Sequence, residues 1–320
     1  MFSPATDIPD LSGKVYIVTG GNSGIGKYTV LHLAQQNAKV YMGARSLQKA
    51  KAAIEEIKTK TQRPDLDISI LKMDMLELRS IKSAAGEFLS KENRLHGMVN
   101  NAGIMAVANG ISKDGFEYQW QTNYLSHWLL TFLLTPVMEL TATTVPVGTV
   151  RIVNVSSSNH KMAPPQGIDF ENINLQGPGP SSNPWVRYGQ SKLGNYLHAL
   201  SLHQKLSEKG IWTASLHPGI VDTNLSTNIE MFAISILSSR PVIWLLRRVG
   251  FMLSTDQGSW TQLFAIAGRD FGAALSGNYL EPIAKKGTVK MPRGVTSEDL
   301  QDRLWKWTES EMKAKGFIDW

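Results

Sequence analysis

The chain has 320 residues, of which 42% are hydrophobic and 19% charged, an ordinary composition for a globular protein with a full core. It contains no cysteine, which excludes disulfides, thiol catalysis and cysteine-ligated metals. The seven histidines form no zinc-binding motif, so we predict no metal site. The net charge of +6 is spread along the chain, which argues against nucleic-acid binding but would suit an anionic cofactor.

Two segments were candidates for membrane targeting, and neither has the required composition. Residues 1–11 lack the basic and apolar regions of a secretory signal. The most apolar stretch, 231–253, is broken by Pro241 and by Arg247 and Arg248, whereas a spanning helix needs about 20 largely uncharged residues. We therefore expect a cytoplasmic protein without a transmembrane span. Peripheral docking through residues 242–253, with the two arginines meeting lipid phosphates, is an alternative.

A glycine-rich turn follows the first predicted strand. Residues 15–18 are apolar and mostly β-branched, as in a buried strand, and residues 27–34 have helical spacing. The turn between them carries three glycines, Gly20, Gly24 and Gly26. This geometry aims backbone N–H groups at a phosphate, and a Cβ atom there would block a pyrophosphate. The alternatives are a P-loop, disfavoured because Tyr28 stands where Ser or Thr must bind magnesium, and a turn without a ligand.

Strands and helices alternate through the rest of the chain. Further strands are expected over residues 39–42, 68–74, 95–101, 150–155, 211–216 and 277–282. Further helices are expected over residues 46–60, 114–140, 188–206, 255–267 and 297–315. This alternation predicts an α/β fold, a single Rossmann-type domain over residues 1–320 with a doubly wound parallel sheet and helices on both faces.

The end of the second predicted strand bears on cofactor choice. Folds that bind NAD usually carry an acidic residue near this point, which holds the ribose 2′-hydroxyl. Here Ala44 is followed by Arg45, whose guanidinium could bind a 2′-phosphate, so the sequence predicts NADP(H). An exposed arginine that merely precedes the next helix is the alternative.

Several motifs together resemble those of the short-chain dehydrogenase/reductase family. They are Thr19 to Gly26, Asn100-Asn101-Ala102-Gly103, Asn123, Ser157, Tyr188-x-x-x-Lys192 and Pro218-Gly219. Each is weak alone, but together they are specific and cover residues 14–223. The long loop before Tyr188, Arg45 and the C-terminal helix are most similar to the retinol-dehydrogenase-like and fungal biosynthetic branch. Over residues 224–320 the resemblance is loose.

The resemblance implies a catalytic set of Asn123, Ser157, Tyr188 and Lys192. Tyr188 would exchange a proton with the substrate oxygen, while Lys192 would lower the tyrosine pKa and hold the nicotinamide ribose. Ser157 would orient the substrate oxygen, with Ser156 and Ser158 as alternatives. Asn123 would distort its helix and hold a water that leads to Lys192.

For Asn123, the alternative is an amide with a purely structural role whose hydrogen bonds are all satisfied.

The resemblance also implies cofactor contacts: Asp74 would contact the adenine, unless it caps the next helix, and Thr223 would bind the nicotinamide amide. The residues predicted to touch the cofactor are Gly20, Asn22, Ser23, Gly24, Ile25, Gly26, Arg45, Asp74, Met75, Asn101, Ala102, Gly103, Tyr188, Lys192, Pro218, Gly219, Val221 and Thr223.

These features predict an NADP(H)-dependent oxidoreductase that interconverts an alcohol and a carbonyl on a lipophilic small molecule, such as a secondary metabolite or a retinoid- or steroid-like compound. Residues 11–223 would form the cofactor-binding and catalytic core, and residues 224–320 the substrate lid and C-terminal elements. Segments 159–186 and 224–253 are expected to close over the substrate. A non-catalytic NADP(H)-binding redox sensor is the alternative, against which the intact catalytic set argues. We expect a monomer or a homodimer.

Overall fold

The core of the protein is an eight-stranded sheet in the order β3-β2-β1-β4-β5-β6-β7-β8. The computed structural model describes residues 1–179, 183–221, 252–292 and 294–319. The strands are β1 Val15–Thr19, β2 Lys39–Ala44, β3 Ile68–Lys72, β4 Gly97–Asn100, β5 Val150–Val155, β6 Ile211–Leu216, β7 Tyr279–Glu281 and β8 Lys285–Lys286. Strands β1 to β7 run parallel, which confirms the predicted sheet, and only β8 is antiparallel to its neighbour.

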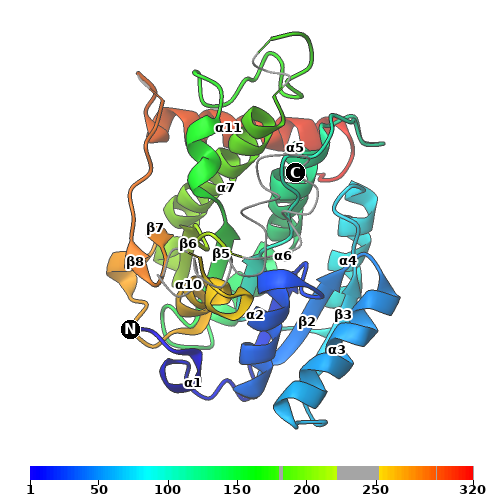
Figure 1. The fold of residues 1–320 in the computed structure, drawn as a ribbon, viewed down its shortest axis with the longest axis vertical. Helices are drawn as coiled ribbons and strands as arrows, with labels where there is room; N and C mark the ends of the chain where they lie inside the picture. The colour runs from blue at the N-terminus through cyan, green and yellow to red at the C-terminus, as the bar shows by residue number, and fades with distance from the viewer. Residues whose placement is uncertain (180–182, 222–251, 293, 320) are drawn as a thin grey trace.

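Helices cover both faces of this sheet (Figure 1). The α-helices are α1 Pro4–Asp7, α2 Gly24–Gln35, α3 Leu47–Thr61, α4 Leu78–Lys91, α5 Tyr118–Trp120, α6 Ser126–Ala142, α7 Pro184–Leu206, α10 Thr255–Ala267 and α11 Ser297–Ala314. The π-helix η1 spans Gln121–Leu125, and the 3-10 helices are η2 Ser158–Met162, η4 Ser207–Lys209 and η6 Ala273–Leu275. One hydrophobic core lies under α2, α3 and α10, and a second lies under α4, α6 and α7, with α11 packed outside α7.

The central strand β1 shows why the strands of this sheet are continuous apolar runs in the sequence. All five of its residues are buried. A parallel strand in the middle of such a sheet is covered by helices on both faces, so it cannot alternate apolar and polar residues.

Several element boundaries differ from the sequence-based expectations. Helix α7 begins at Pro184 rather than Tyr188, because Asn183 caps it by accepting a bond from the backbone N–H of Trp185 at 2.9 Å, and proline suits the first helical position. The expected helix over residues 114–140 starts at Tyr118 and contains the π-helical turn η1. Helix α4 and strand β8 had not been predicted.

The strand order places a switch point between β1 and β4. Chain connections leave in opposite directions on either side of it, and ligands of such sheets bind at the carboxyl ends of the strands beside this point. The glycine turn follows β1 and the segment Asn101-Ala102-Gly103 follows β4, so the two predicted cofactor motifs meet at this edge.

Candidate active site

The turn between β1 and α2 is shaped for an anion. Gly20 and Gly24 have φ angles of +65° and +55°, which favour glycine. A Cβ atom on Gly26 would lie 2.5 Å from the Gly20 carbonyl oxygen and from Asn101 Nδ2, so a side chain does not fit there. The N-cap residue of α2, Ser23, makes no side-chain capping bond. The backbone N–H groups of the first helical turn therefore lack a side-chain cap from Ser23, as at helix starts that bind anions.

Thr19 joins this turn to the segment after β4. Its Oγ1 accepts bonds from the backbone N–H groups of Asn101 and Ala102, both at 2.9 Å. The Asn101 side chain in turn donates to the Thr19 carbonyl at 2.7 Å. The predicted cofactor residues of the two segments are thus held as one unit.

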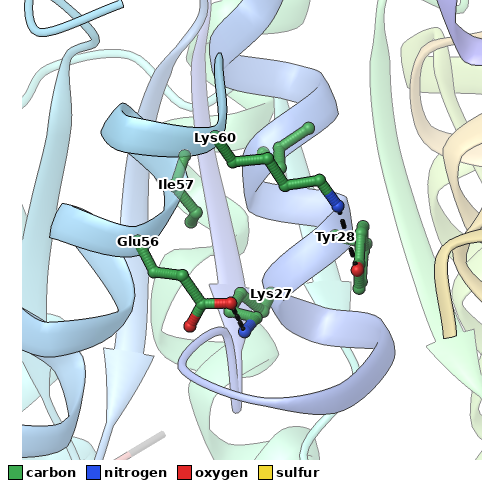
Figure 2. Close-up of a pocket in the computed structure, with 6 residues that line it drawn as sticks. Lys27, Tyr28, Glu56, Ile57 and Lys60 are labelled. Carbon is green, nitrogen blue, oxygen red and sulfur yellow. Dashed lines mark hydrogen bonds and ion pairs between the residues drawn. The ribbon is translucent and has the colours of Figure 1, made fainter. Parts of the chain in front are cut away.

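The contacts of α2 with α3 argue against the P-loop alternative. Lys27 pairs with Glu56 at 2.6 Å, and Lys60 donates to the Tyr28 hydroxyl at 3.0 Å, in a small pocket of about 10 Å³ between the two helices (Figure 2). A P-loop lysine must reach back over the phosphates, and the next residue must offer a hydroxyl to magnesium. Here both side chains are engaged with α3 instead.

Arg45 lies where the sequence analysis expected it. It follows β2 directly and is exposed, while Ser46 caps α3 by accepting a bond from the Lys49 N–H at 3.3 Å. Strand β2 runs beside β1, and the Gly21 N–H donates to the Gly43 carbonyl at 3.1 Å. Arg45 therefore lies before the helix, at the same sheet edge as the glycine turn.

Asp74 does not cap a helix, so that alternative is wrong. Its Oδ1 accepts a bond from the Leu76 N–H at 3.0 Å, in a turn that precedes α4. The N-cap position of α4 belongs to Glu77, and the Leu78 N–H is bound by Asp114 at 2.8 Å. Met75 follows in the same turn, and its carbonyl accepts from Ser126 Oγ at 2.7 Å.

The structure brings Ser157, Tyr188 and Lys192 together after β5. Tyr188 and Lys192 are one turn apart on α7, and Lys192 Nζ lies 5.6 Å from the centre of the tyrosine ring. Lys192 also donates to the Val155 carbonyl at 2.8 Å. The Ser157 hydroxyl lies close enough to the phenol to affect its pKa through a hydrogen bond.

The two alternative serines, Ser156 and Ser158, do not lie beside Tyr188. Ser156 Oγ donates to the Lys192 carbonyl at 2.7 Å, and Ser158 is the first residue of η2. Of the three serines, Ser157 is therefore the one beside Tyr188.

Burial dominates the protonation of this pair. It raises the pKa of Tyr188 to about 12, against a smaller lowering by the Ser157 hydrogen bond, and it lowers the pKa of Lys192 to about 7. The phenol is therefore protonated at neutral pH and able to act as an acid. The expected lowering of the tyrosine pKa by Lys192 is not seen in the protein by itself.

Asn123 sits in the π-helical turn, so its helix is distorted as predicted. Its side chain is also fully engaged: Oδ1 accepts from the Ile104 N–H at 2.8 Å, and Nδ2 donates to the Ile104 carbonyl at 3.0 Å and to Ser191 Oγ at 2.9 Å. A Cβ atom on Gly103 would lie 3.2 Å from Asn123 Oδ1 and 3.5 Å from Lys192 Nζ. The asparagine thus fixes the segment after β4 beside the lysine.

The segment after β6 completes the described part of the site. Pro218 and Gly219 follow that strand, and Gly219 has a φ of +96°. Val221 forms a parallel bridge with Leu253, and a Cβ atom on Gly258 would meet both Val221 and Ile25. Thr223 lies outside the described residues, as do most of the proposed lid over residues 224–253 and most of the proposed membrane-docking stretch over residues 242–253.

One buried ion pair beside the site had not been anticipated. Arg187 Nε lies 3.4 Å from Glu117 Oε1, with 3% and 1% of the two side chains exposed. Burial raises the pKa of Glu117 to about 7. The pair joins the start of α5 to the turn of α7 that carries Tyr188. No local pattern links two residues so far apart in the chain.

Comparison with known proteins identifies the family to which the chain is similar. The family model for short chain dehydrogenase matches residues 14–170. The curated short-chain dehydrogenase/reductase drtF from Aspergillus calidoustus is 46% identical and covers 98% of each chain. The structure of an uncharacterized protein from Mycobacterium paratuberculosis is 26% identical, with a TM-score of 0.71 over 98% of this chain and 97% of that one. NADPH-bound carbonyl reductase from chicken fatty liver, at 22% identity, 87% and 100% coverage and TM-score 0.61, shows the fold alone.

The sheet, the glycine turn and the Ser157-Tyr188-Lys192 cluster define a nucleotide-binding oxidoreductase with a Rossmann-type fold. The chain belongs to the short-chain dehydrogenase/reductase family, and the predicted resemblance, including its fungal branch, is confirmed. In the described ranges, no helix has the length and apolar character needed to cross a membrane.

Proposed function

We propose that the protein is an NADP(H)-dependent oxidoreductase that interconverts a carbonyl and an alcohol on a lipophilic small molecule. The observation that carries this proposal is the cluster of Ser157, Tyr188 and Lys192 at the sheet edge that also bears the glycine turn. The fungal relative named as a short-chain dehydrogenase/reductase supports the oxidoreductase activity, and a secondary metabolite as the substrate class is part of our proposal.

We expect the cofactor to bind at the edge of the sheet that bears the glycine turn. The glycine turn and first turn of α2 would bind the pyrophosphate, Arg45 the 2′-phosphate, Asp74 the adenine and Lys192 the nicotinamide ribose. The segments Asn101 to Gly103 and Pro218 to Val221 would line the rest of the cleft. The uncapped helix start and the absence of an acid after β2 support this assignment.

In the reducing direction, the carbonyl carbon would receive a hydride from a bound reduced nicotinamide. Tyr188 donates its phenolic proton to the carbonyl oxygen, which becomes the alcohol. Ser157 holds that oxygen by a hydrogen bond, and Lys192 restores charge balance beside the phenolate. In the oxidising direction the Tyr188 phenolate would take the alcohol proton while the hydride leaves the carbinol carbon for a bound oxidised nicotinamide, whose positive charge would favour the phenolate.

The first prediction tests Tyr188 as the acid. Tyr188→Phe should retain NADPH binding, because the ring stays, but lose turnover by about 10²- to 10⁴-fold, because no proton is donated. Carbonyl reduction is followed by NADPH absorbance and NADPH affinity by fluorescence titration. Tyr196→Phe, two turns further along α7, is the matched control. A kcat near that of the wild type in Tyr188→Phe would refute the assignment.

The redox-sensor alternative gives a different result in the same experiment. A sensor would bind NADPH, yet the wild type would turn over none of a broad panel of carbonyls and alcohols. The lid role of residues 224–320 is likewise part of this proposal. It predicts that lipophilic members of the panel are preferred over polar ones of the same size.

A further inference from the structure

A buried histidine lies between the cofactor side and the catalytic side of the site. His127, in the first turn of α6, has only 1% of its surface exposed. Its Nε2 lies 2.8 Å from Thr19 Oγ1, and its Nδ1 lies 2.9 Å from the Asn123 carbonyl oxygen. One imidazole therefore touches a residue of the glycine turn and a residue of the π-helical turn.

The hydrogen bonds of Thr19 determine which nitrogen carries the proton. A hydroxyl has two acceptor lone pairs and one donor hydrogen. Both lone pairs of Thr19 are used by the Asn101 and Ala102 N–H groups. The hydroxyl hydrogen then goes to His127 Nε2 at 2.8 Å, in preference to the Val99 carbonyl at 3.4 Å.

The other ring nitrogen leads to the same tautomer. The partner of Nδ1 is a carbonyl, which can only accept, so Nδ1 must be the protonated nitrogen. Burial, with a smaller effect from the nearby Lys192 charge, lowers the pKa of His127 to about 4, so the ring is neutral at pH 7. Both contacts are satisfied by the neutral Nδ1–H form alone.

These contacts connect the two residues, Thr19 and Asn123, that hold the segment after β4 by hydrogen bonds. Thr19 holds the start of the segment after β4 through Asn101 and Ala102, and Asn123 holds its next part through both backbone groups of Ile104. Gly103, between them, is the point where the chain passes beside Lys192. His127 is a direct link between the two clamping residues, independent of the loop itself.

We propose that His127 is a positioning residue that, as the neutral Nδ1–H tautomer, couples the nucleotide-binding turn at Thr19 to the catalytic turn at Asn123. The inference rests on the proposed oxidoreductase function. In this role, His127 fixes the distance between the cofactor cleft and Lys192. It does not contact the substrate itself.

The tautomer is tested directly by ¹⁵N NMR of the full-length protein with NADP⁺ bound. His127 should show a protonated Nδ1 and an unprotonated Nε2 from about pH 6 to 8. Assignment would use His127→Asn, whose spectrum lacks this resonance. A protonated Nε2, or an imidazolium in this range, would overturn the proposal.

The coupling is tested with His127→Phe, which keeps a planar ring but removes both bonds. The loss should raise the Kd for NADP⁺ and lower kcat, each by about tenfold, because a buried partner is left unpaired on each side. His127→Asn retains a donor near the Nδ1 position, so kcat should recover in part while the Kd stays raised. His198→Phe, a buried histidine on α7 whose Nε2 has no partner among the described residues, is the control and should change both by less than about twofold.

Wild-type Kd and kcat in a folded His127→Phe would refute the coupling. If that variant does not fold, His127→Asn carries the test, and a wild-type Kd for NADP⁺ in that variant would refute the coupling. Failure of the proposed function would appear differently, as absence of turnover in the wild-type protein, whereas the tautomer and the NADP⁺ affinity are measured without substrate.

Discussion

At the scale of single residues, Lys192 combines burial with a cationic role. Its ammonium has one backbone acceptor, the Val155 carbonyl at 2.8 Å, and burial lowers its pKa to about 7. An anionic dinucleotide in the adjacent cleft favours the charged form of the amine and opposes the effect of burial. The charge on Lys192 should therefore depend on the cofactor.

The second prediction is that NADP⁺ binding takes up protons at about pH 8. The free protein holds Lys192 mostly neutral there, and the complex should hold it charged, so up to about one proton is bound per cofactor. Calorimetry in two buffers of different ionisation enthalpy measures this number. Lys192→Ala should abolish the uptake, whereas Lys60→Ala, a lysine of α3 that contacts Tyr28, should not. Equal heats in both buffers for the wild type would contradict it.

Arg45 is the residue that distinguishes the two nicotinamide cofactors in our proposal. The third prediction is that the wild type binds NADP⁺ more tightly than NAD⁺ and that Arg45→Ala removes the difference. A charge-assisted contact to the 2′-phosphate is worth about 1.5–3 kcal/mol, or roughly 10- to 150-fold in Kd. Arg63→Ala removes another exposed arginine, one that pairs with Asp65, and serves as the control. Equal wild-type Kd values for the two cofactors would exclude the role.

At the scale of elements, the start of α7 is tied to the start of α5 by charge. Glu117 accepts the Trp120 N–H at 2.8 Å and pairs with Arg187, the residue before Tyr188. The attraction of Arg187 lowers the pKa of the carboxyl, but burial raises it more, so the pKa rises to about 7. The ionised form is therefore less favourable in the folded protein than in the unfolded chain.

The fourth prediction concerns Glu117→Gln. The folded protein binds a proton on Glu117 at higher pH than the unfolded chain does, so this group stabilises the wild type at pH 5 and loses that effect as the pH rises through 7. Relative to wild type, the glutamine variant should therefore gain on the order of 3 kcal/mol between pH 5 and pH 8. Urea unfolding at both values measures the difference. Glu139→Gln, at a partly exposed glutamate that pairs with Lys209, is the control, and an equal change in the two variants would refute the perturbed carboxyl.

Most elements with contiguous signals were predicted, although the amphipathic helix α4 was missed, and elements defined by distant contacts were not predicted. The glycine turn and the Tyr188/Lys192 face depend on residues within one turn or one helix, so their spacing is visible in the sequence. The π-helical form of η1 and the two-residue strand β8 depend on their neighbours in space, and no local pattern marks them.

The same distinction applies inside the site. The resemblance of short motifs was enough to name Ser157, Tyr188, Lys192 and Asn123. The contacts of His127 with Thr19 and of Arg187 with Glu117 join residues 108 and 70 positions apart in the chain, so only the folded structure reveals them. A histidine one turn after Asn123 was visible, but its partner was not.

At the scale of the whole molecule, buried neutral histidines govern the response to acid. His96, His127 and His198 are at most 3% exposed, and burial lowers their pKa values to about 4, about 4 and about 3. Each histidine takes up a proton in the unfolded chain near pH 6.5 but not in the folded protein until much lower pH. The stability that this neutrality confers is therefore present above pH 6.5 and is lost as the pH falls.

The fifth prediction is a large loss of stability between pH 7 and pH 5. Each of the three histidines should cost about 2 kcal/mol over this range, as should His217, whose pKa burial also lowers to about 4. Glu117, with the opposite sign, should return about 2 kcal/mol, leaving a net loss on the order of 6 kcal/mol. Urea unfolding across the range measures it. His198→Phe removes one such group without touching the site and should reduce the loss by about 2 kcal/mol. If the free energy of unfolding is unchanged from pH 7 to pH 5, the histidines are not held neutral by burial.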